Sequence, residues 1–217
     1  MAYNQFTLTK ALTELSLVTE DEDMFSSVTA HPLPASLLET LEAGRILALS
    51  INTEKAKSEF IIAPLLLHVK SALHNQISLF SGVDLNVDLE RGLNGICDFI
   101  IAHSKNQHIL TAPLISIVEA KNDNIRDGLG QCIAEMYAAQ SFNQQHNINL
   151  PRVYGIVTTG SAWKFLRLEG DRVTFDLLEY YIDNPPMIVG IILHIILTTT
   201  AGCRPPGFRA LPTALSR

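Results

Sequence analysis

Three residues in the middle of the chain have the types and spacing of a metal-binding site. Glu119 and Lys121 follow the apolar run 114–118, and side chains two positions apart on a strand point to the same face. Asp98 stands inside a second apolar stretch, GICDFII. A carboxylate in that position must be hydrogen-bonded, reach solvent or bind a cation, because burying it without a partner is costly.

The Glu119–Lys121 pair taken alone is typical of an ion pair at the end of a strand, which contributes little to stability. Asp98 changes this interpretation. If the two apolar stretches form a hairpin through the polar segment 103–111, Asp98 and Glu119 face one another. Two carboxylates suit a hard cation such as Mg²⁺ or Mn²⁺, which can activate a water molecule. A neighbouring lysine can orient that water or neutralise developing charge.

The segments around these residues alternate between helical and strand patterns. Helices are expected from Pro34 onward and over 53–73, 124–142 and 187–197. Strands are expected over 77–87, 95–102, 114–120, 152–158, 163–168 and 173–181. This order predicts a single α/β domain with a mixed sheet flanked by helices, over residues 34–200. Residues 1–33 are expected to be a solvated N-terminal segment, and 201–217 a disordered tail.

The residues around the Glu-x-Lys pair resemble a known family. The pattern is that of the PD-(D/E)xK nuclease superfamily. It consists of an acid within one strand and a second strand that ends PLISIVEAK, with a Glu-bearing helix before them and a Gln-bearing helix after them. The stretch looks especially like the N-terminal nuclease domain of type I restriction-enzyme motor subunits and small stand-alone relatives. The resemblance covers about residues 55–145, and it implies a restriction-endonuclease-like fold.

The resemblance also implies a role for each matching residue. Asp98 and Glu119 match the metal ligands, and Glu59 matches a helical glutamate that assists metal binding. Lys121 matches the catalytic lysine. Gln131 matches a residue that contacts the substrate or supports the site.

Two positions depart from the family pattern. Cys97 precedes Asp98 where the family name has proline. Several relatives have tyrosine four residues after the glutamine, whereas this chain has Glu135 there and Tyr137 two residues later. Glu135 lies one helical turn from Gln131 and could share its face, or Tyr137 could pack inward.

The overall charge restricts the class of function. A net charge of −6 and a pI of about 5.6 argue against a protein that coats nucleic acid generally. They do not exclude a nuclease, because bound cations and a local basic rim can offset the acidic total. Two functions stay open: a divalent-metal-dependent nuclease acting on DNA or RNA, with DNA preferred, and a nuclease-fold protein without turnover that serves as an interaction module.

The remaining features concern location and assembly. Cys97, Cys132 and Cys203 are odd in number and form no CxxC pair, so neither a disulfide framework nor a zinc site is expected. No secretory signal is evident, and a reducing cytoplasm fits best. The apolar run 187–197 is shorter than the roughly 20 residues of a membrane span. It is expected to be a buried helix or to form a homodimer.

Overall fold

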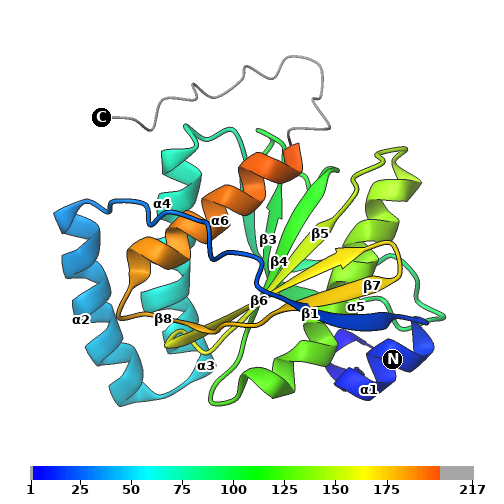
Figure 1. Cartoon of the computed structure of the whole chain (residues 1–217), viewed down its shortest axis with the longest axis horizontal. Helices are drawn as coiled ribbons and strands as arrows, with labels where there is room; N and C mark the ends of the chain where they lie inside the picture. The colour runs from blue at the N-terminus through cyan, green and yellow to red at the C-terminus, as the bar shows by residue number, and fades with distance from the viewer. Residues whose placement is uncertain (1, 201–217) are drawn as a thin grey trace.

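The computed structural model describes residues 2–200, and its ribbon is shown in Figure 1. The strands are β1 (Val18–Glu22), β2 (Ser78–Asp84), β3 (Ile96–Ala102), β4 (Leu114–Ala120), β5 (Val153–Thr158), β6 (Ala162–Glu169), β7 (Arg172–Asp176) and β8 (Tyr180–Tyr181). The helices are the 3-10 turn η1 (Tyr3–Gln5), α1 (Leu8–Glu14), α2 (Ala35–Ile51), α3 (Glu54–Lys57), the π-helical η2 (Ser58–Ile62), α4 (Ala63–Ala72), α5 (Ile125–Gln145) and α6 (Pro185–Thr200).

All the strands belong to one mixed sheet, in the order β1-β7-β6-β5-β4-β3-β2, with β8 paired to β6. The antiparallel strands β2, β3 and β4 form the expected meander. Helix α5 then carries the chain over to β5, which runs parallel to β4, and β6 and β7 return antiparallel. The α/β fold with a mixed sheet, predicted from the order of the patterns, is confirmed.

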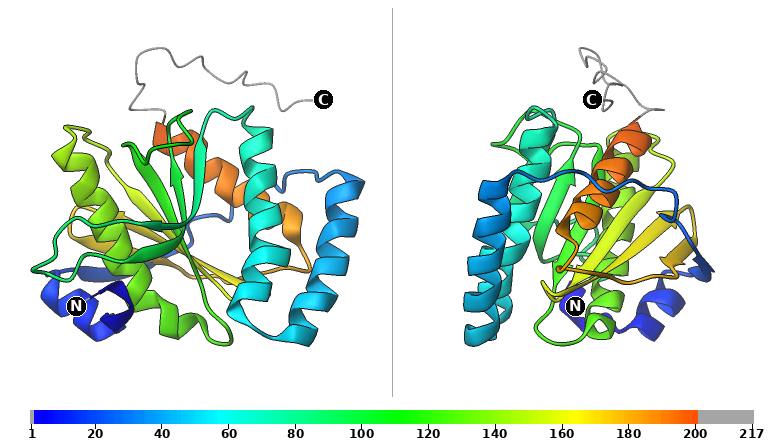
Figure 2. Two further views of the ribbon diagram at one scale, coloured as in Figure 1. Left: turned by 180° about the vertical axis from the view of Figure 1, so that it is seen from behind. Right: turned by 60° about the vertical axis from the view of Figure 1, so that its left-hand side comes forward.

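Helices cover both faces of this sheet (Figure 2). Helices α1 and α5 pack on one face, where their buried side chains meet those of the central strands. Helices α4 and α6 cover the other face, α2 packs against α3, η2 and α4, and these helices enclose a second core. The central strands β4 and β5 are buried along their whole length, as expected for a sheet covered on both sides. They are therefore a rigid support for side chains at their ends.

The N-terminal residues belong to the domain, which corrects the expected solvated segment over 1–33. Turn η1 and helix α1 pack against α5, and β1 is an edge strand parallel to β7. The acidic side chains of β1 are paired with arginines of β6 and β7, which are far away in the sequence but close in the sheet. Arg172 Nη1 lies 2.8 Å from Glu20 Oε2, and Arg167 Nη2 lies 2.7 Å from Glu22 Oε2. These charge pairs explain how a strongly acidic segment becomes a strand.

The expected helix over 53–73 consists of three consecutive parts, α3, η2 and α4. Pro64 lies in the first turn of α4, directly after η2, so its missing N–H removes one bond from a helix that continues through this position. In the turn just before it, the Ala63 N–H bonds to the Ser58 carbonyl five residues back, as in a π-bulge. This extra residue per turn rotates the side chains before Pro64 relative to those after it.

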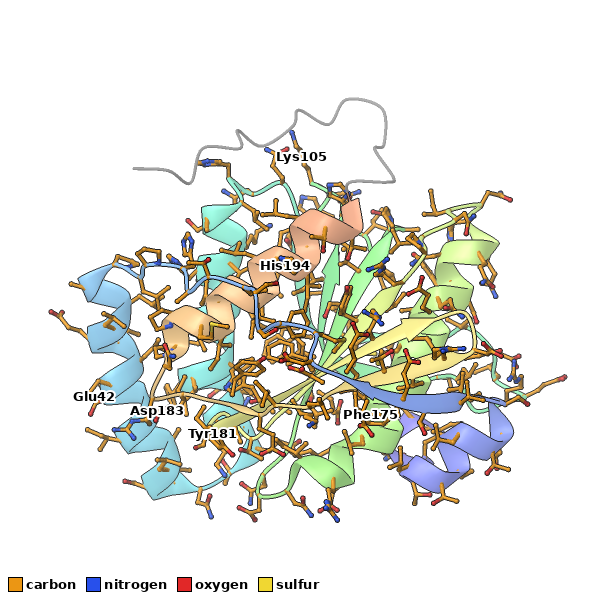
Figure 3. The ribbon with its side chains drawn as sticks, viewed as in Figure 1. Glu42, Lys105, Phe175, Tyr181, Asp183 and His194 are labelled. Atoms are coloured by element: carbon orange, nitrogen blue, oxygen red, sulfur yellow. The ribbon has the colours of Figure 1, made fainter. Side chains whose placement is uncertain are left out.

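Helix α6 confirms the helix expected over 187–197, and of the two alternatives for it, a buried helix or a homodimer contact, the structure shows the buried helix. Within that range only His194 and Leu197 are exposed, and Figure 3 labels His194 on α6. The other apolar side chains of the helix pack into the chain's own core, so they are not free to form a second interface. None of the described helices combines the length and the apolar character needed to cross a bilayer. The tail expected over 201–217 lies outside the described residues.

Candidate metal-binding and catalytic site

The candidate residues meet at one edge of the sheet, where β3 begins and β4 and β5 end. The register pairs Phe99 with Val118 and Ile100 with Ile117, so the next facing pair in that register is Asp98 and Glu119. The Ala120 N–H donates to Asp98 Oδ2 at 2.8 Å. The hairpin expected from the sequence therefore brings the two carboxyl groups to neighbouring positions on two strands.

Lys121 and Gln131 complete a polar cluster on the face of the sheet covered by α5. The Lys121 ammonium donates to Glu119 Oε1 and to Gln131 Oε1, the latter at 3.1 Å. Helix α5 approaches closely here, because a Cβ atom on Gly128 would lie 2.9 Å from Lys121 Cγ. The close packing leaves the lysine side chain only one-fifth exposed.

Burial controls the electrostatics of this cluster. Only 1% of Glu119 is exposed, and burial together with the Asp98 carboxylate raises the pKa of Glu119 to about 8, although Lys121 opposes the shift. Burial also raises the pKa of Asp98. Burial alone would lower the pKa of Lys121, but the Glu119 carboxylate outweighs it and the pKa is raised. Lys121 is therefore a stable cation, and the carboxyl groups hold protons more tightly than usual.

Glu135 extends the cluster into the protein interior. Its Oε1 accepts a hydrogen bond from Gln131 Nε2 at 3.0 Å. Burial, and then the Glu119 charge, raise the pKa of Glu135 well above its ordinary value. Of the two alternatives left open by the sequence, Glu135 is thus the residue that shares the Gln131 face. Tyr137 instead contacts Arg91, whose guanidinium lies 5.1 Å from the ring centre.

Glu59 is not part of this cluster, which corrects the residue chosen from the sequence. Its carboxylate is half-exposed and forms an ion pair with Lys55 at 2.7 Å. A second acid, Glu54, lies near enough to the cluster for its charges to affect the pKa of that residue. Burial raises the pKa of Glu54, with Lys121 and Asp98 as its charged neighbours.

Lys57 fixes the loop that follows the Glu-x-Lys strand. It is a buried lysine at the end of α3, and its ammonium donates to the backbone carbonyl and to Oδ1 of Asn122. Asp123 Oδ1 is 3.7 Å away. Because Asn122 directly follows Lys121, this contact connects helix α3, and with it Glu54, to the candidate site. No pattern in the sequence distinguishes Lys57 from an ordinary surface lysine.

The residues present are suited to a hard divalent cation. Glu119 Oε2 is buried and has no hydrogen-bond partner among the described residues, so beside Asp98 there is an oxygen that can bind a cation once the carboxyl group is ionised. Within residues 2–200, no three His, Cys, Asp or Glu side chains are grouped closely enough to hold an ion by themselves. Mg²⁺ commonly uses one or two carboxylates and keeps several waters, so the Asp98–Glu119 pair fits that ion.

Comparison with known proteins adds no assignment. No family model matches the sequence, and no curated protein matches it.

Proposed function

We propose that the chain is a divalent-metal-dependent nuclease that hydrolyses phosphodiester bonds of nucleic acid, with DNA as the preferred substrate. The observation that carries this proposal is the buried Glu119. One of its oxygens is bound to Lys121 and the other has no partner within residues 2–200, and Asp98 lies at the facing position of the next strand. This is the donor set expected of a Mg²⁺ or Mn²⁺ site in hydrolytic phosphate chemistry.

Each residue of the cluster has a distinct role in the proposal. Asp98 and Glu119 would hold the cation, with Glu54 as the nearby helical acid. A bound Mg²⁺ supplies Lewis acidity and lowers the pKa of a bound water. Lys121 is charged and held in place, so it can orient the attacking water or stabilise negative charge that develops on the phosphate. Gln131 would hold the Lys121 ammonium in place through its side-chain oxygen, next to where the substrate would bind.

Cleavage is the direct test of the proposal. Plasmid and single-stranded DNA, and a matched RNA, are incubated with the protein in Mg²⁺ or Mn²⁺ and in a chelator. We expect metal-dependent cleavage that is lost in Lys121→Ala and kept in Lys55→Ala. The second variant is the matched control, because Lys55 is an exposed cation outside the cluster. Equal cleavage by wild type and Lys121→Ala would reject the nuclease role.

Calorimetric titration with Mn²⁺ tests the metal site without requiring turnover. Asp98→Asn and Glu54→Gln should weaken binding, because each removes a negative charge from the cluster. Glu59→Gln should bind like wild type, because Glu59 pairs with Lys55 instead. If Glu59→Gln weakens binding and Glu54→Gln does not, the assignment of the helical acid is reversed.

The second candidate function is a nuclease-fold protein that binds nucleic acid or protein without cleaving anything. The net charge of −6 favours it, because cleavage of a polyanion usually involves a basic surface. Absence of Mn²⁺ binding in the titration, together with nucleic-acid or protein binding by the wild type, would establish this function in place of the first.

A further inference from the structure

Glu135 is an unusual residue for the interior of α5. It is completely buried, its Oε2 has no hydrogen-bond partner among the described residues, and its one side-chain bond is to an uncharged amide, that of Gln131. A buried carboxyl group without a contacting cation costs stability, and an apolar side chain of the same size avoids that cost. Stability therefore does not explain why α5 carries an acid at this position.

The bond to Glu135 determines which way round the Gln131 amide lies. A side-chain amide has an acceptor oxygen at one corner and a donor NH₂ at the other. Here the NH₂ faces Glu135 Oε1 at 3.0 Å, and the oxygen faces the Lys121 ammonium at 3.1 Å. In the reverse orientation the NH₂ would meet the ammonium, two donors in contact. The carboxyl keeps an acceptor oxygen when it is neutral, so this constraint holds in either protonation state.

The orientation of the amide in turn fixes the ammonium. Lys121 has three N–H donors, of which one binds Glu119 and one binds Gln131. Two fixed bonds leave the third N–H with a defined direction, in which it can donate to a water molecule or a phosphate oxygen that binds there. We propose that Glu135 is a positioning residue, which holds Lys121 beside Glu119 through the Gln131 amide. Its effect on catalysis rests on the proposed nuclease function, whereas the positioning itself does not.

Two substitutions separate positioning from a structural role. Glu135→Met removes the acceptor and fills the same volume with an apolar side chain. Glu135→Gln keeps an acceptor oxygen. If Glu135 were a structural residue, Glu135→Met would lower the melting temperature. We expect Glu135→Met to leave the melting temperature unchanged or to raise it. We expect kcat to fall about 10–100-fold, the usual range for residues that orient the residues of a metal site without contacting the metal. Glu135→Gln should stay within a few-fold of wild type.

The second measurement does not depend on cleavage. In the ¹⁵N NMR spectrum of the full chain, the Gln131 side-chain amide should exchange slowly with solvent, because its NH₂ binds a buried group. Glu135→Met should abolish that protection, and Glu135→Gln should retain it. Gln140 lies on the same helix, and its side-chain amide donates to the Gly170 carbonyl. The exchange of this amide should be unchanged in both variants, so it is the internal control.

The outcomes are distinguishable. An unchanged Gln131 amide in Glu135→Met, or equal losses of kcat in both variants, overturns the positioning role. If the wild type cleaves nothing while the Gln131 amide still responds to Glu135→Met, the nuclease proposal fails and the positioning role is supported.

Discussion

The substitution Glu119→Gln gives the sharpest test of the site's electrostatics. Burial and the Asp98 carboxylate raise the pKa of Glu119 from 4.5 to about 8. Between these two values the folded protein keeps a proton that the unfolded chain has released. The stability contributed by this proton is fully present below pH 4.5 and is lost as the pH rises toward 8. Glutamine keeps the shape of the side chain and removes the titration.

The size of the effect follows from linkage. Each pH unit in the window changes the free energy of unfolding by about 1.36 kcal/mol. Wild-type protein without metal should therefore lose about 2–3 kcal/mol between pH 5 and pH 7 that Glu119→Gln does not lose. Buried histidines act in the opposite direction, because burial lowers the pKa of His103 to about 4. They are the same in both proteins and cancel in the difference.

Urea denaturation in a chelator at pH 5, 6 and 7 measures this difference. The two unfolding free energies should diverge steadily with pH, with the glutamine variant becoming relatively more stable at pH 7. Glu135, whose pKa is also raised mainly by burial, is present in both proteins. Parallel curves for the two proteins would show that Glu119 is ionised at pH 5 and that the reasoning from burial is wrong.

Three further predictions concern the metal and the packing around it. Mn²⁺ affinity, measured by calorimetry, should increase as the pH rises toward 8, since the cation and the Glu119 proton compete. Gly130→Ala should lower the unfolding free energy by about 1–3 kcal/mol in urea denaturation, because its Cβ would lie 2.2–2.5 Å from the backbone of residues 6–8. Tyr3→Phe should cost about 1 kcal/mol in the same assay, because the buried hydroxyl donates to the Leu85 carbonyl at 2.7 Å.

The central sheet could be predicted from sequence because its signals are local. The strand expected over 114–120 has the same limits as β4, and the helix expected over 124–142 lies within α5 except for its first residue, Asn124, the N-cap. Strand β1 could not be found in this way. Its sequence, VTEDE, has almost no apolar residues, and the arginines that pair with it lie about 150 positions away. Long-range charge pairing leaves no periodic pattern in the sequence.

The same distinction applies to the site. Asp98 and Glu119 were brought together by reasoning from a hairpin, which is a local connection. The position of Glu59 outside the cluster could not be predicted, because it depends on the direction of a helical side chain, which is set by where the helix begins and by the π-helical turn before Pro64. Glu54 was overlooked because an acid in the first turn of a helix has an ordinary explanation in the helix dipole.

The arrangement of charges explains how such a site is tolerated in the fold. Asp98, Glu119 and Glu135 all have raised pKa values caused mainly by burial, whereas Lys121 is the cation bonded to Glu119. Without a metal, the proton that Glu119 holds up to a pH of about 8 removes its repulsion with Asp98. A divalent cation would replace that proton and supply the same compensation. The cluster is therefore suited to exchange protons for a cation near neutral pH, because the two states neutralise the same buried charges.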